Sequence, residues 1–145
     1  MSAFLSELKV EPATDKDDGN WRLVADLVYQ SDVANLTFTV PAGFVTNFAS
    51  VPRIPIVYEL AGDTSSEAAT VHDFLYTTHP VDRATADDVL REASKATGVP
   101  DWRRQIMWAG VRVFGWSHWG TAATDPSSSA TKAAVQPVPE SLKAK

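Results

Sequence analysis

The sequence predicts an α+β domain, with an N-terminal antiparallel β-meander, a packed irregular loop, three C-terminal helices and an extended polar tail. Apolar and polar residues alternate over much of residues 3–40, as in strands that bury one face. Helix-capping and helix-breaking residues mark out three segments between residues 64 and 115. Residues 121–145 contain three prolines and no aromatic residue, which favours an extended tail.

Three strands are expected in the meander. Residues 3–10 predict an edge strand, and the acidic turn at residues 15–20 predicts a hairpin connection. Residues 21–30 predict a second strand and residues 36–40 a third. One face of such a sheet needs a cover, which we expect the helices to supply.

The loop after the meander is irregular but apolar. Pro41, Gly43 and Pro52 exclude a continuous helix or a central strand there. Because Phe44 and Phe48 lie among them, the loop is expected to pack on the core.

The first helix is expected to begin at a capping box, residues 64–67, and to end near Thr78, before Pro80. Asp82 or Thr85 is expected to cap the second helix.

The third helix is expected to begin near Pro100 and to end at Gly115. Its Trp-rich end, residues 108–119, raises the alternative of a helix that lies on a membrane surface. Arg112 is the only basic residue there after Arg104, so a helix that covers the sheet is the favoured interpretation.

The composition divides the chain into one domain, residues 1–120, and a low-complexity tail, residues 121–145. The tail cannot bury enough apolar surface to offset its chain entropy. An ordered tail would therefore need a partner, most simply another copy of the chain.

Charge and cysteine content exclude several classes of function. A net charge of -5 argues against a nucleic-acid-binding surface. Without cysteine, the chain has no disulfide and no thiolate metal site. No signal peptide and no membrane span are expected.

An adjacent His-Asp pair is the main candidate for chemistry. His72 and Tyr76 share one face of the first helix, with Asp73 beside them. In one interpretation His72 is a general base, Asp73 a Ca²⁺ ligand and Tyr76 a support. In the other, commoner one, His72 is a hydrogen-bonded core residue and Asp73 is solvated. His79 is expected at the surface, and His118 in amphipathic packing.

Asp87 is the candidate partner of His72. It opens the second helix, which is expected to lie antiparallel to the first because the connection is short. In one alternative its carboxylate forms a hydrogen bond with the second ring nitrogen of His72 and fixes the tautomer. In the other it only interacts favourably with the dipole of its own helix. Asn47 and Arg53, at the apolar loop, are the candidate binding residues.

Several segments together resemble a known family. They are VPAGFVTNFASVPR at residues 40–53, HDFLY at residues 72–76, Arg83, Asp87 and MWAGVRVFG at residues 107–115. They resemble a family of uncharacterised phage and prophage proteins, whose first segment typically reads VPAGFxTDFASxPR. The resemblance implies a phage origin and no established activity. Asn47 stands where that family usually has Asp, which weakens an acid–base or ligand role at this position.

The HDxxY pattern is also similar to the phospholipase A2 superfamily, in which an Asp of the next helix pairs with the His. This resemblance implies His72 as base, Asp73 as Ca²⁺ ligand, and Tyr76 and Asp87 as support. The chain departs from that superfamily in having only Gly62 before the helix in place of a glycine-rich calcium loop, and no cysteine to link the helices.

Two functions are therefore expected. The first is a virion-associated assembly protein of the phage tail, connector or head surface, made in the host cytoplasm and binding other phage proteins or its own copies through residues 121–145. The alternative is a phage-encoded hydrolase that acts on lipid or cell envelope through His72 and Asp87. No cofactor is expected for the first function, whereas Ca²⁺ at Asp73 is the candidate cofactor of the second.

Overall fold

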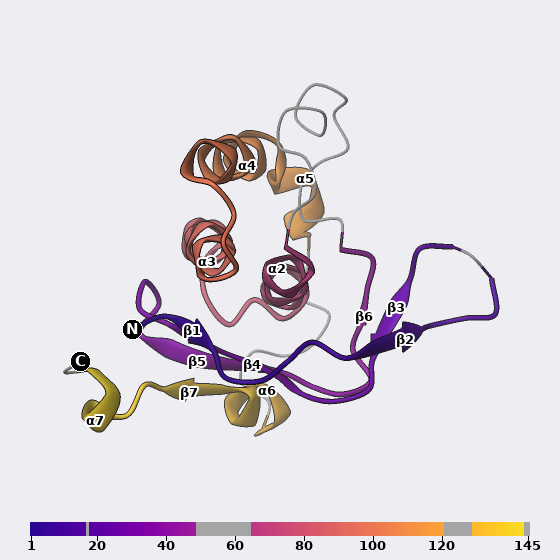
Figure 1. The fold of residues 1–145 in the computed structure, drawn as a ribbon, viewed down its shortest axis with the longest axis horizontal. Helices are drawn as coiled ribbons and strands as arrows, with labels where there is room; N and C mark the ends of the chain where they lie inside the picture. Colours follow the sequence, from indigo (N-terminus) through magenta and orange to yellow (C-terminus); the bar gives the residue numbers. More distant parts are fainter. Residues whose placement is uncertain (17, 49–64, 121–128, 144–145) are drawn as a thin grey trace.

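The computed structural model describes residues 1–16, 18–48, 65–120 and 129–143. The fold is layered: helices α2 (Ser66–Thr78) and α3 (Arg83–Ala96) lie on a four-stranded sheet, and α4 (Asp101–Phe114) lies outside α3 (Figure 1). Antiparallel strands followed by helices confirm the predicted α+β class.

The larger sheet is antiparallel, with the order β1-β4-β5-β7. Its strands are β1 (Ala3–Phe4), β4 (Leu27–Ser31), β5 (Leu36–Val40) and β7 (Val135–Pro137). The hairpin of β4 and β5 sets the register, with Tyr29 opposite Phe38. These two side chains are fully buried and face the helices at the centre of the core.

A second, smaller antiparallel sheet has the order β2-β3-β6. Its strands are β2 (Val10–Pro12), β3 (Trp21–Leu23) and β6 (Val45–Thr46). The hairpin of β2 and β3 encloses the acidic turn, as predicted. Strand β6 comes from the apolar loop and lies beside α2, where Phe44 packs edge-on against Phe74 with ring centroids 5.9 Å apart.

The predicted strands at residues 3–10 and 21–30 are each divided between the two sheets, so the expectation of two continuous strands is wrong. The Ser6 hydroxyl explains the break. It accepts a hydrogen bond from Val28 N (2.8 Å) and donates one to Asp26 O (3.0 Å). A side chain that takes backbone partners in this way interrupts the ladder, and the alternating pattern of apolar residues does not reveal it.

The core lies between the larger sheet and helices α2 and α3. The apolar residues that meet there are fully or almost fully buried. They include Leu27, Tyr29, Phe38 and Val40 from the sheet, Val71 and Leu75 from α2, and Val89 and Leu90 from α3.

Helices α2 and α3 each begin after a residue whose side chain caps the helix, and these caps fix where the two helices start in the sequence. Asp82 accepts a hydrogen bond from Thr85 N (2.7 Å), which confirms Asp82 as the cap of α3. The cap of α2 is Ser65, whose hydroxyl accepts from Ala68 N (3.2 Å). The cap of α2 is therefore one residue later than the capping box predicted.

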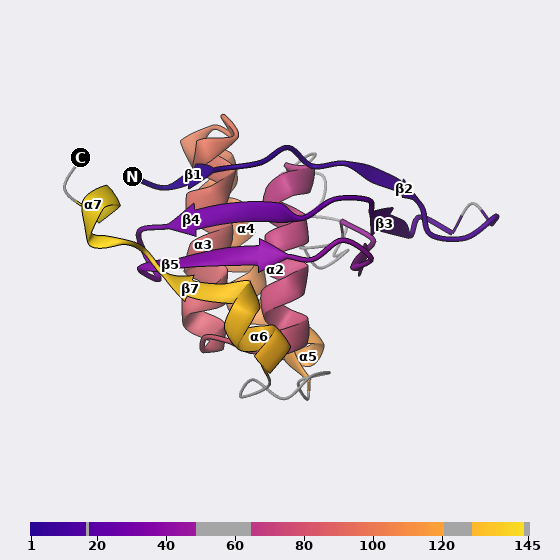
Figure 2. The ribbon, with the colours of Figure 1, turned by 90° about the horizontal axis from the view of Figure 1, so that it is seen from below.

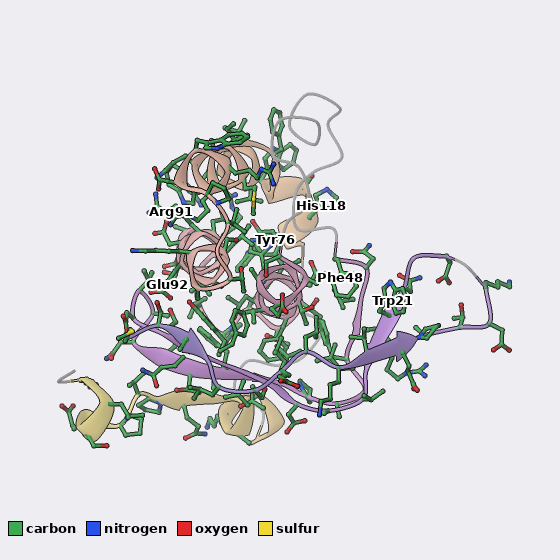
Figure 3. All side chains as sticks on the ribbon, viewed as in Figure 1. Trp21, Phe48, Tyr76, Arg91, Glu92 and His118 are labelled. Atoms are coloured by element: carbon green, nitrogen blue, oxygen red, sulfur yellow. The ribbon has the colours of Figure 1, made fainter. Side chains whose placement is uncertain are left out.

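Helix α4 packs on α3 and not on the sheet, so its predicted role as a cover for the sheet is wrong. Helices α2 and α3 already occupy that face. The contact with α3 includes a hydrogen bond from Trp108 Nε1 to Asp88 (2.7 Å) and a cation–π contact, in which the Arg91 guanidinium lies 4.6 Å from the Trp108 ring centroid. Figure 3 shows Arg91 directed toward α4 and Glu92 toward the sheet. The outer side of α4 is consequently exposed.

The described part of the tail, residues 129–143, folds back onto the domain. It contains α6 (Ser129–Ala134), strand β7 and α7 (Glu140–Lys143). Strand β7 pairs with β5 at the sheet edge (Figure 2), and Val138 is buried. The chain's own sheet thus holds this segment. Among the described residues, no helix is long and apolar enough to span a membrane.

Candidate active site

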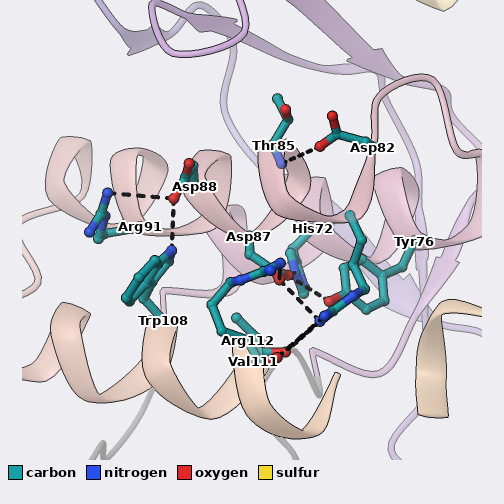
Figure 4. A network of polar contacts seen from close by, with 11 residues as sticks. His72, Tyr76, Asp82, Thr85, Asp87, Asp88, Arg91, Trp108, Val111 and Arg112 are labelled. Carbon is teal, nitrogen blue, oxygen red and sulfur yellow. Dashed lines mark hydrogen bonds and ion pairs between the residues drawn. The ribbon is translucent and has the colours of Figure 1, made fainter. Parts of the chain in front are cut away.

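Asp87 is the centre of a buried polar network between α2, α3 and α4. Its Oδ1 atom lies 3.0 Å from His72 Nε2 and accepts a hydrogen bond from the Tyr76 hydroxyl at 2.5 Å (Figure 4). The residue is fully buried, and His72 is almost so. The packing of α2 against α3 therefore produces the contact between Asp87 and His72, which was one of the two alternatives that the sequence left open.

Two arginines bind the second oxygen of this carboxylate. Arg112 donates to Asp87 Oδ2 at 2.9 Å, and Arg83 lies 3.4 Å from the same atom. Arg83 also donates to Val111 O (3.1 Å), which ties α3 to the end of α4. Sequence reasoning assigned these arginines no role. The i,i+4 spacing of Arg83 and Asp87 was the available signal.

Asp87 is a carboxylate, and this fixes the proton on His72. Burial by itself raises the pKa of Asp87, but hydrogen bonds from His72, Tyr76 and Arg112 outweigh it and hold the pKa below its ordinary value. An ionised carboxylate can only accept, so Nε2 of His72 carries the hydrogen. In the neutral form of the ring Nδ1 is then the acceptor, and the hydrogen bonds of His72 to the described residues involve Nε2 alone.

Tyr76 remains a neutral donor. Burial, followed by its hydrogen bond to Asp87 and the charge of that carboxylate, raises the pKa of the Tyr76 phenol. Its ring also contacts that of His72, with centroids 4.2 Å apart. Tyr76 therefore holds both the carboxylate and the imidazole in place.

His72 lines a cleft of about 340 Å³ between α2, the smaller sheet and α5 (Trp116–Trp119). One wall comes from the N-terminal segments and the other from the helices. The lining residues are Asn20, Phe44, Val45, Thr46 and Asn47 on the first wall, and His72, Asp73, Tyr76, Thr77, Gly115 and His118 on the second.

Asp73 faces this cleft from the same helix but does not join the Asp87 network. Its Oδ2 accepts a hydrogen bond from Thr46 Oγ1 at 2.6 Å, and Phe48 N donates to the same hydroxyl at 3.1 Å. Burial raises the pKa of Asp73, partly offset by the Thr46 hydrogen bond and by His72. Asp73 and Asp87 therefore have pKa values shifted in opposite directions around one histidine.

The remaining candidate residues have different positions. Asn47 lines the cleft, whereas Arg53 lies outside the described residues. His118 is exposed at the cleft and not packed as expected. His79 is half-buried, so its predicted surface position is wrong: it stacks on Trp119 with centroids 3.9 Å apart, and its Nε2 lies 2.7 Å from Trp119 O.

Gly115 forms a close-packed part of the cleft wall. A Cβ atom at this position would lie 2.5 Å from the Tyr76 hydroxyl oxygen and would also meet Val111 O. The absence of a side chain at Gly115 thus allows Tyr76 to reach Asp87.

The oxygen donors around Asp73 are a modest set for a cation. Among the described lining residues, the cleft offers the Asp73 carboxylate, the hydroxyls of Thr46 and Thr77, and the side-chain amides of Asn20 and Asn47. Within residues 1–16, 18–48, 65–120 and 129–143, no group of three or more His, Cys, Asp or Glu side chains is placed to hold a metal ion. A Ca²⁺ ion at Asp73 would need further backbone or water oxygens.

The fold and site thus define a small α+β protein with a His–Asp pair beside a polar cleft. A family model described as "Protein of unknown function (DUF1353)" matches residues 21–111, and the chain belongs to this family. The match contains α2, α3, His72, Asp73, Tyr76 and Asp87. No curated protein and no solved structure matched the chain.

Proposed function

We propose that this protein is a hydrolase in which His72 activates water for attack on an ester. The observation that supports this most strongly is the orientation of His72. Its Nε2 edge is held by a buried carboxylate at 3.0 Å, while the ring lines a cleft. A histidine that a buried carboxylate holds in one tautomer, with its ring in the wall of a cleft, is the arrangement of a general base.

The chemistry follows from the tautomer. Nδ1 of His72 takes a proton from a water molecule as the water oxygen bonds to the ester carbon. Asp87 stabilises the imidazolium that forms, and Tyr76 keeps the carboxylate aligned. When the carbon–oxygen bond to the leaving alcohol breaks, the same imidazolium returns the proton to that alcohol.

Lipid or cell-envelope esters are the proposed substrates, and a phage is the proposed source. The support is the similarity of His72, Asp73, Tyr76 and Asp87 to the phospholipase A2 pattern, together with the resemblance to phage proteins. The hydrogen bond from Tyr76 to Asp87 agrees with the supporting role which that similarity implies for both residues. Under this proposal Ca²⁺ is the candidate cofactor, and Asp73 would be its ligand.

Ester hydrolysis by matched variants tests the proposal. We expect His72→Gln and Asp87→Asn to lose at least about a hundredfold in kcat. Asp88→Asn is the control, because Asp88 is the neighbouring carboxylate and bonds Trp108 and Arg91 instead. Each protein is assayed on short-chain and phospholipid esters, with Ca²⁺ and with a chelator, after circular dichroism has shown that it is folded.

Equal background hydrolysis by the wild type and His72→Gln on every ester, with and without Ca²⁺, would exclude the hydrolase. Calcium dependence that disappears in Asp73→Asn would support Asp73 as a ligand. Activity unaffected by the chelator would leave His72 and Asp87 as a metal-independent pair.

Virion assembly is the second candidate, and the position of β7 favours it. Strand β7 ends the larger sheet, so its outer edge presents backbone groups on which another chain can add a strand. Sedimentation velocity of the full chain, alone and with virion proteins of the source phage, tests this. A monomer that binds none of them would exclude the assembly role.

A further inference from the structure

An exposed apolar stripe runs along the outer side of α4 and into α5. Trp102 is 55% exposed, Val113 60% and Trp116 70%, and Ala109 lies exposed between them. At 100° per residue, positions 102, 109 and 113 fall within about 40° of arc around the helix axis. Trp116, the first residue of α5, follows Gly115 directly after the end of α4 and is the most exposed of these side chains.

Helix α4 does not use the stripe to pack within its own fold. The opposite side of α4 already buries Met107, Gly110 and Val111 against α3. Large apolar residues that gather on a side of a helix not needed for packing indicate a surface for binding.

The charges around the stripe favour an anionic partner. Residues 101–119 contain three Arg and one Asp, a formal charge of +2 in a chain of net charge -5. The Arg103 guanidinium lies 5.2 Å from the Trp102 ring centroid. In the described parts of the chain Arg103 forms no ion pair, whereas Arg104 and Arg112 pair with Asp101 and Asp87.

Tryptophan with an arginine guanidinium beside its ring, at the surface of a helix, is the chemistry of a bilayer interface. Indole rings prefer the headgroup region, where the ring is in an apolar layer and the N–H is hydrated. A cation next to such a ring attracts anionic headgroups. We propose that the α4–α5 stripe binds the surface of an anionic phospholipid bilayer.

The stripe ends next to the candidate active site. Trp116 lies between Gly115 and His118, and both of these line the cleft that contains His72. A protein bound to lipid through this stripe would hold the cleft close to the headgroups and their ester bonds. This inference rests on the proposed hydrolase for its substrate class, a phospholipid ester, but lipid binding itself can be measured independently.

Vesicle co-sedimentation tests the inference. We expect the wild type to bind phosphatidylglycerol vesicles, more weakly at high salt, and to bind phosphatidylcholine vesicles weakly. Trp102→Ala/Trp116→Ala should lower the partition coefficient on the order of a hundredfold, about tenfold for each indole, and Arg103→Gln should lower it for phosphatidylglycerol only. Val24→Ala/Val33→Ala is the control, since both side chains are half-exposed but lie in connections between strands, outside α4 and α5.

The two proposals fail in different ways. Absence of binding to phosphatidylglycerol, or equal binding by the double Trp variant, would overturn the lipid surface even if short-chain esters are hydrolysed. A wild-type dimer that Trp116→Glu converts to a monomer would assign the stripe to a second copy and would also overturn it. Normal vesicle binding by His72→Gln, with hydrolysis absent in every variant and in the wild type, would retain the lipid surface and reject the hydrolase.

Discussion

Gly115→Ala should destabilise the protein through Tyr76. The added Cβ would lie 2.5 Å from the Tyr76 hydroxyl oxygen and against Val111 O, and the backbone oxygen cannot move freely. Tyr76 must therefore shift and lose its hydrogen bond to Asp87. A hydrogen bond to a charged group contributes about 1.5–3 kcal/mol, and overpacking costs about 1–3 kcal/mol. The helix preference of Ala over Gly returns up to about 1 kcal/mol.

The expected net loss is about 1.5–6 kcal/mol, or roughly 3–24 °C in Tm for a domain of this size. Urea unfolding followed by circular dichroism measures it, and a double-mutant cycle with Tyr76→Phe identifies its cause. Because Phe lacks the clashing oxygen, Gly115→Ala should be less destabilising in that background. A loss below about 0.5 kcal/mol in the wild-type background, or equal losses in both backgrounds, would refute the reasoning.

Four further substitutions have expected outcomes. Glu92→Ala removes the acceptor of four hydrogen bonds, from Tyr29, Ser31, Asp32 and Val33; it should cost about 3 kcal/mol or more in urea unfolding, and a loss under about 1 kcal/mol would contradict this. The fold lowers the pKa of Asp87 and raises that of Asp73. Ionised Asp87 therefore stabilises the fold at pH values above the pKa that Asp87 has in the unfolded chain, and this stabilisation is lost as the pH falls through the pKa that it has in the folded chain. Ionisation of Asp73, in contrast, opposes folding as the pH rises. Near neutral pH, Asp87→Asn should therefore lower Tm and Asp73→Asn raise it, and shifts of the same sign would contradict the assignment. Asp82→Ala should cost about 1 kcal/mol because it removes the cap of α3, and Thr85→Ala is the control, since its backbone N–H is retained.

Local patterns allowed the helices to be predicted and gave the His72–Asp87 contact as one of two alternatives. A cap such as Asp82 acts within its own turn, and His72 and Tyr76 share a face by helix geometry alone. Two consecutive helices with a short connection pack side by side. These relationships involve neighbours in the sequence, so the sequence records them directly.

The features that were missed depend on distant partners. The Ser6 hydroxyl divides two strands by bonding residues about twenty positions away. Arg112 reaches Asp87 from a third helix, across 25 positions. The outward position of α4 follows from the space that α2 and α3 already occupy. No periodicity in a single segment contains this information.

Arg83 and Arg112 matter for the question of whether the Asp87 network only stabilises the helix packing or also supports His72 as a general base. Four groups surround Asp87: His72 and Tyr76 at Oδ1, and Arg83 and Arg112 at Oδ2. A carboxylate with this many donors remains ionised, so in the proposed hydrolase Asp87 would not take up the proton that His72 removes from water. Under that proposal the proton would stay on the imidazole until the leaving alcohol receives it. The donors that hold the three helices together would then also keep the proton on His72.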